Sequence, residues 1–252
     1  MVHMMTKPKF LVPLAISLFI AAFFTGTQPL RPEMATVSSI FVILFALPSY
    51  WAVISTKGWQ RGCIVLLSLG VYALLIESSA IHTGFPYGDF IYNDLLGEKV
   101  FGLTPWTVAF AYPPILLLSY WISRKLLTNL ADMNGGLSLF LATAGLTALF
   151  AMAIDLVLDP AAVALGFWNW ESPGFFYEVP LINFMGWLLS GFIGGIILHT
   201  TWGKSDTSMP PTALTYSGVT ILWFWTWINV FQTHIIPAVI GFGLLYVFIR
   251  RK

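Results

Sequence analysis

IDLVLDPAAVALGFWNWESPGFFYEVPLINFMGW, residues 154–187, is the stretch that decides the fold and the candidate site. Two carboxylates, Asp155 and Asp159, stand at the end of an apolar run, and an aromatic-rich segment follows them. A second apolar run then opens with Asn183 and Trp187. This pattern predicts two membrane helices joined by a loop, with polar side chains where the helices meet the loop.

A second stretch, residues 77–106, has a similar composition. Its carboxylate, Glu77, lies in an apolar run and is followed by HTGFPYGDFIYNDLLGEKVFGLTPW. Both stretches pass from a helix-end carboxylate through a Gly-Phe pair to a proline that enters the next helix, a match too short to establish an internal repeat. We expect the two stretches to face each other and to form one site.

The composition is that of an integral membrane protein. Of the 252 residues 58% are hydrophobic and only 9% are charged, with a mean hydropathy of +0.81, whereas soluble domains carry roughly 25% charged residues. The net charge of +1 excludes a basic surface for nucleic acid, and the single Cys63 excludes an internal disulfide. We expect one transmembrane domain over residues 1–252, surrounded by membrane lipid in the plasma membrane.

Apolar runs predict an all-α, polytopic bundle of about eight transmembrane helices, at residues 10–25, 34–54, 63–81, 105–122, 137–158, 181–200, 212–228 and 235–249. The last two runs are alternatively one broken helix, which gives seven. Cytoplasmic segments are enriched in Lys and Arg. Eight helices with both termini cytoplasmic leave only Arg31 and Lys99 outside, and place inside Lys7, Lys9, Lys57, Arg61, Arg124, Lys125, Lys204, Arg250, Arg251 and Lys252.

In this topology, both long loops lie on the outer side. Residues 82–104 and 159–180 are rich in Gly, Pro and aromatic residues, and long loops between packed helices are commonly functional. We expect these two loops to form the rim of a site.

The carboxylates are the first candidates for chemistry. Asp155 and Asp159 are four residues apart and share a helix face, where repulsion and burial both favour keeping one of them protonated. Glu77 is an ionisable group inside a span, which by default suggests function. Acid–base catalysis needs such a combination of protonated and ionised groups. Alternatively, Asp159 only ends its helix before Pro160, and Glu77 makes a structural hydrogen bond.

Other side chains would complete the site. Asn183 either caps its helix or orients a water molecule, and shares a face with Trp187. The aromatic rings of the second loop could stabilise a cation. Alternatively, they form only the aromatic belt at the membrane interface. The candidate substrate-binding residues are Trp168, Trp170, Tyr177, Asn183, Trp187, Tyr87, Asp89, Tyr92 and His82. A Trp cluster at Trp223, Trp225 and Trp227 is expected to belong to the belt or to helix packing. The histidines are scattered, so we expect no metal site.

The combination of E-x6-GFPYGDFIY-x9-GLTPW with DLVLDP-x7-WNW-x6-YEVPLINFMGW resembles the carotenoid biosynthesis membrane-protein family, which includes carotenoid 1,2-hydratases and bisanhydrobacterioruberin hydratases. The resemblance covers roughly residues 67–198, and the outer helices match it only in hydropathy. It implies an enzyme that adds water to a terminal isoprenoid double bond of an acyclic C40 or C50 carotenoid without a cofactor. It also implies other carotenoid biosynthesis enzymes as partners.

The residues suit that reaction, which needs an acid, groups that shield a tertiary cation and a positioned water. We expect Asp155 or Asp159 to be the acid and Glu77 to hold or deprotonate the water. Three alternatives stay open: a carotenoid cyclase or isomerase, a prenyltransferase and a non-enzymatic carotenoid or lipid binder. The two outer cations, Arg31 and Lys99, are few for a diphosphate substrate.

Overall fold

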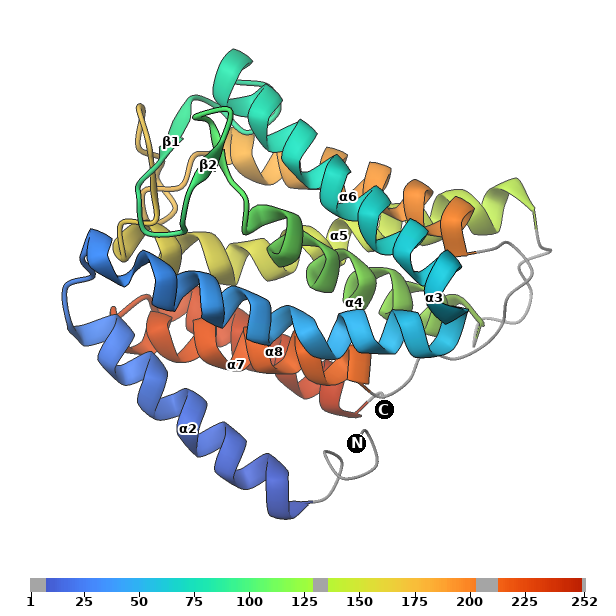
Figure 1. Ribbon diagram of the computed structural model, residues 1–252, viewed down its shortest axis with the longest axis horizontal. Helices are drawn as coiled ribbons and strands as arrows, with labels where there is room; N and C mark the ends of the chain where they lie inside the picture. Colours follow the sequence, from blue (N-terminus) through green and yellow to red (C-terminus); the bar gives the residue numbers. More distant parts are fainter. Residues whose placement is uncertain (1–7, 129–135, 203–212, 251–252) are drawn as a thin grey trace.

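The computed structural model is a bundle of α-helices, which confirms the predicted fold class (Figure 1). It describes residues 8–128, 136–202 and 213–250. In that part of the chain the α-helices are α2 (Pro8–Thr27), α3 (Ala35–Thr83), α4 (Val108–Thr128), α5 (Leu137–Ala164), α6 (Leu181–Trp202), α7 (Ala213–Phe231) and α8 (Ile235–Arg250). A 3-10 turn, η1 (Pro32–Met34), connects α2 to α3.

Helix α3 is a helical hairpin rather than one straight rod. It has 49 residues, and its backbone leaves the helical region at Gly58, where φ is 74° and ψ is 168°. Glycine reaches this conformation without a Cβ clash. The second arm turns back at the bend and diverges from the first (Figure 1). Close to the bend the arms touch, since a Cβ on Gly62 would lie 2.9 Å from the Cα of Ile54. The two arms contain the two separate helices that the sequence predicted.

The two long loops lie against each other, as predicted. Strand β1 (Phe90–Tyr92) pairs antiparallel with β4 (Trp168–Trp170), and Phe90 lies opposite Trp170. A second short ladder, β2 (Lys99–Val100) with β3 (Thr104–Pro105), folds the first loop on itself.

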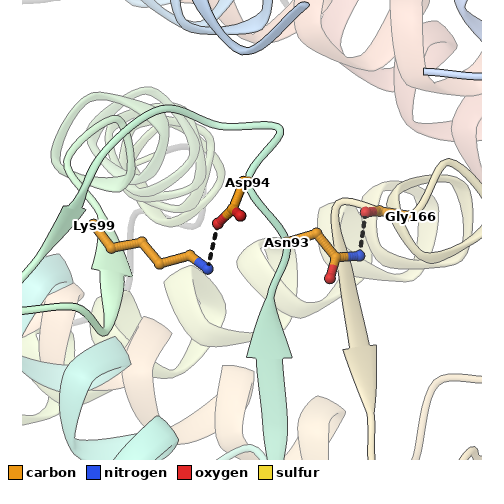
Figure 2. Close-up of polar contacts among 4 residues, drawn as sticks. All are labelled: Asn93, Asp94, Lys99 and Gly166. Carbon is orange, nitrogen blue, oxygen red and sulfur yellow. Dashed lines mark hydrogen bonds and ion pairs between the residues drawn. The ribbon is translucent and has the colours of Figure 1, made fainter. Parts of the chain in front are cut away.

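Two polar contacts lie just past β1, one between the two loops and one within the first loop (Figure 2). The side chain of Asn93 donates to the carbonyl of Gly166 at 2.6 Å, and Lys99 Nζ lies 2.8 Å from Asp94 Oδ1. The first contact ties the first loop to the turn that follows α5, so the two loops are held as one unit.

Helix α5 runs farther than the sequence predicted. We expected it to end at residue 158, with the loop starting at 159, but it passes through Pro160 and ends at Ala164. A proline removes one backbone N–H and normally disrupts a helix. Here the residues around it are buried, and Asn229 of α7 donates to the carbonyl of Val157 at 2.7 Å. Packing and this contact hold the helix together, and both aspartates therefore lie inside it.

Small residues bring α5 and α6 close together and set their register. A Cβ on Gly191 would lie 2.7 Å from the Cα of Ala148, and one on Gly195 would lie 2.9 Å from the Cα of Ala144. Close approach at small residues is a common way of packing membrane helices. Continuing at intervals of about four residues, the same two faces bring Asn183 of α6 to the aspartates of α5.

Three segments of the described residues are long and apolar enough to cross a membrane, namely Pro32–Thr83, Leu137–Ala164 and Leu181–Trp202. Shorter apolar helices cover Val12–Thr27 and Ile235–Arg250. The fold is thus that of a helical membrane protein, while eight spans and a single domain over residues 1–252 stay predictions. Cytoplasmic termini stay a prediction too. Of the basic residues behind that prediction, Lys7, Lys204, Arg251 and Lys252 lie outside the described residues.

Candidate functional site

A cavity of about 460 Å³ lies beneath the paired loops, in the size range of small-molecule sites. Helices α2, α3, α4, α5, α6 and α7 and both loops contribute to its walls. Eight of the predicted site residues line it: Glu77, Asp159, Asn183, Trp187, Tyr87, Tyr92, Trp168 and Trp170. The structure therefore brings residues from the two predicted stretches to one place.

Glu77 lies on the second arm of α3 and is only 4% exposed. Two tyrosine hydroxyls donate to it: Tyr92 to Oε2 at 2.9 Å and Tyr112 to Oε1 at 2.6 Å. A third hydroxyl, of Tyr87, lies 2.6 Å from that of Tyr112. Hydrogen bonds from hydroxyls stabilise a carboxylate that burial would otherwise penalise.

The hydroxyls of the two loop tyrosines are suited to donate. Burial raises the pKa of both Tyr87 and Tyr92 well above the ordinary value, and the neighbouring Glu77 raises it further. Both hydroxyls therefore keep their protons at neutral pH and act as donors to the carboxylate network.

The second polar group of the site joins α5 to α6. Asn183 is 2% exposed, and its amide nitrogen donates to Asp155 Oδ2 at 2.9 Å and also to Asp159 Oδ2. One amide thus binds both carboxylates, so the side chain of Asn183 does not serve only as a helix cap. Asp159 lines the cavity, whereas Asp155 is not among the lining residues. Of the two aspartates, only Asp159 can meet a molecule in the cavity directly.

Aromatic rings form the walls between the two polar groups. Trp187 stacks on Tyr112 with ring centroids 4.8 Å apart, and Tyr92 and Trp168 make a T-shaped contact with ring centroids 5.6 Å apart. The indole of Trp170 donates to the carbonyl of Tyr87 at 3.1 Å. Hydrogen bonding and stacking fix the rings, so their faces are held in place around the cavity.

Three predicted residues lie elsewhere. His82 and Asp89 are exposed and outside the cavity lining. Tyr177 faces the α7–α8 turn, where its ring lies 4.5 Å from that of His234, and its hydroxyl accepts from the backbone N–H of Ile236 at 3.3 Å. These three residues are close in sequence to residues of the site, but their side chains lie outside the cavity.

Sequence reasoning missed Tyr112 and misjudged Trp225. Tyr112 was detectable as a hydroxyl in an apolar helix, since buried tyrosines usually find a polar partner. Trp225 was assigned with Trp223 and Trp227 to belt or packing, but it lines the cavity. The other two do pack against α2: Trp223 donates to the carbonyl of Ala15, and Trp227 meets Phe19 edge-on.

Comparison with known proteins identifies the family of this chain. The family model described as carotenoid biosynthesis protein matches residues 34–248, a longer span than the 67–198 expected from the motifs. The chain is 34% identical over 195 residues to the bisanhydrobacterioruberin hydratase of Haloarcula japonica, an alignment that covers 74% of this chain and 64% of that protein. The chain thus spans less than two thirds of its relative's length. No solved structure matches it. This chain belongs to the carotenoid biosynthesis protein family.

Proposed function

We propose that this protein adds water across a terminal isoprenoid double bond of an acyclic carotenoid and thereby forms a tertiary alcohol. The carrying observation is one aromatic-walled cavity that contains both Glu77 under two tyrosine hydroxyls and Asp159 linked through Asn183 to Asp155. The name of the Haloarcula japonica relative supports hydration over cyclisation or isomerisation.

Asp159 is the proposed acid. Two carboxylates on one amide, in a buried site, cannot both carry charge at low cost, so the favourable state shares one proton between them. Asp159 lines the cavity and therefore delivers this proton to the less substituted CH carbon of the terminal double bond. Asp155 acts behind it as a positioning residue that holds Asn183.

Protonation leaves a tertiary cation on the neighbouring carbon. Trp187, Trp168 and Trp170 line the cavity, and an indole ring that meets the cation offers cation–π stabilisation, about 2 kcal/mol or more for a desolvated cation. The rings also keep bulk water from the cation, so that only a positioned water reacts.

Glu77 is the proposed base. Each carboxylate oxygen accepts more than one hydrogen bond, so Glu77 can hold a water while Tyr92 and Tyr112 donate to it. The water oxygen bonds to the cation and gives a proton to Glu77. Return of that proton to Asp159 completes the cycle, so the net change is addition of one water, and no step needs a metal or an organic cofactor.

We also propose that the protein is a multi-pass enzyme of the plasma membrane that works beside other enzymes of carotenoid biosynthesis. The long apolar helices support its place in a membrane, and its family supports the link to carotenoid biosynthesis. For a prenyltransferase, the diphosphate would need free cations near the loops. Lys99 is instead paired with Asp94 (Figure 2).

The test is expression in cells that make lycopene, followed by mass spectrometry of the pigments. Hydration predicts the gain of one water for each modified end. Unchanged mass with altered absorption would indicate cyclisation or isomerisation, and unchanged pigment would contradict the proposal. Asp159→Asn is expected to abolish the product, while Asp89→Asn, which changes an exposed carboxylate of the first loop, serves as the matched control.

A further inference from the structure

The cavity extends beyond the acid–base residues to an opening between α2 and the first arm of α3. Phe24 on α2 and Val37 on α3 both line it, yet they are 58% and 54% exposed. A side chain that lines a cavity and is also open to the surroundings marks its mouth. In a membrane helix bundle, exposed phenylalanine and valine face lipid.

The opening exists because α2 packs on α7 rather than on α3. Phe19 meets Trp227 at 4.7 Å, Phe23 meets Phe231 at 5.3 Å, and Gln232 donates to the carbonyl of Gly26 at 2.7 Å. From their shared connection, α2 and the first arm of α3 diverge along the bundle (Figure 1). The contacts with α7 hold α2 in this splayed position.

The walls between mouth and site are apolar and largely aromatic. Phe41 and Phe45 of α3 lie 6.1 and 5.4 Å from Phe224 of α7, measured between ring centroids, and all three line the cavity. The polar groups Glu77, Asp159 and Asn183 line the same cavity. The cavity thus has a polar part at the site and an apolar part near the mouth. A molecule with one reactive end and a long apolar chain matches these two parts.

The geometry points to a lipid-facing channel between α2 and α3 that binds the unreacted polyene chain of the substrate while its end group reaches Asp159 and Glu77. The inference rests on the proposed function for the identity of the substrate. A cavity of about 460 Å³ accepts a drug-sized group, so a carotenoid reacts at its end while its chain passes through the mouth into lipid. This arrangement selects long, slender polyenes with an acyclic end.

The test uses Val37→Trp to obstruct the mouth and Ile40→Trp as the matched control. Ile40 lies three residues away on the same helix and is 52% exposed, but it does not line the cavity. Each variant adds one indole at a lipid-facing position. Met34→Trp, at another exposed position of the mouth, is the second variant if Val37→Trp does not fold.

Lycopene binding is measured by absorbance of pigment retained on each purified protein in lipid nanodiscs, and hydration by product mass. We expect Val37→Trp to weaken lycopene binding at least about tenfold, a change of ~1.4 kcal/mol, and Ile40→Trp to bind like the parent. Equal binding by all three proteins, equal loss in both variants, or no binding to the parent would overturn the channel. If binding follows the expectation but no pigment gains water, the channel stands and the proposed function fails.

Discussion

Replacement of Tyr112 by phenylalanine tests the proposed role of Glu77. The change removes the hydroxyl that donates to Glu77 Oε1 at 2.6 Å and leaves the ring that stacks on Trp187 at 4.8 Å. The hydroxyl of Tyr87 loses its 2.6 Å partner as well. The variant thus keeps the shape of the cavity and changes the hydrogen bonding of its proposed base.

The expected magnitude follows from the kind of hydrogen bond that is lost. A hydrogen bond to a charged group contributes about 1.5–3 kcal/mol, whereas a neutral one contributes about 0.5–1.5 kcal/mol. If the bond from Tyr112 keeps Glu77 ionised and so able to take the water proton, its loss leaves Glu77 mostly protonated and lowers kcat about 10- to 100-fold. KM should change little, because the apolar walls that bind the substrate remain.

Hydration rates are measured with lycopene in membranes of known enzyme content. Tyr50→Phe is the matched control, since its hydroxyl donates to the carbonyl of Ala109 at 3.0 Å between α3 and α4, away from the cavity lining. The control should lose some thermal stability and keep its kcat. A Tyr112→Phe enzyme with the parent's kcat, or a Tyr50→Phe enzyme with an equal loss, would refute the proposed role of Glu77.

Three further outcomes are expected. Asp159→Asn should lower kcat about 100- to 10,000-fold, as loss of a general acid does. Asp155→Asn should lower kcat less, because Asp155 only holds Asn183. The reverse order in a rate assay would contradict the assignment of the acid. Gly191→Ala should lower the Tm, because a methyl group there would lie 2.7 Å from a Cα of α5 and overpacking costs about 1–3 kcal/mol. Gly145→Ala should leave the Tm unchanged, because a methyl group there would have no neighbour within 4 Å. An unchanged Tm for Gly191→Ala would count against the contact between α5 and α6. His82→Ala should keep the parent's hydration rate, since this side chain is exposed and outside the cavity; a large loss would contradict its exclusion.

Sequence patterns predicted the features of the fold that depend on local hydropathy and on chemistry within each stretch. Apolar runs located the helices, and the shared make-up of the two loops predicted that they face each other, which the β1–β4 ladder confirms. Ionisable groups within spans identified Glu77 and Asp155 as buried polar groups. Each of these signals comes from the cost of exposing or burying a side chain.

What the sequence could not supply depends on contacts between distant segments. Pro160 predicted a helix end, yet buried neighbours and a hydrogen bond from Asn229 carry α5 through it. Tyr112 lies 35 residues from Glu77, and no spacing within one helix predicts that contact. Tyr177 sits in the aromatic loop of the site, but the fold of that loop turns its ring toward His234.

Solvent isotope labelling tests the central claim most directly. The purified protein in nanodiscs converts lycopene in water that contains heavy oxygen and deuterium, and the product is examined by mass spectrometry and NMR. Acid-catalysed hydration predicts, at each modified end, one solvent oxygen on the tertiary carbon and one solvent hydrogen fixed on the neighbouring carbon. A product that carries solvent hydrogen without solvent oxygen, or oxygen taken from O₂, would contradict the account.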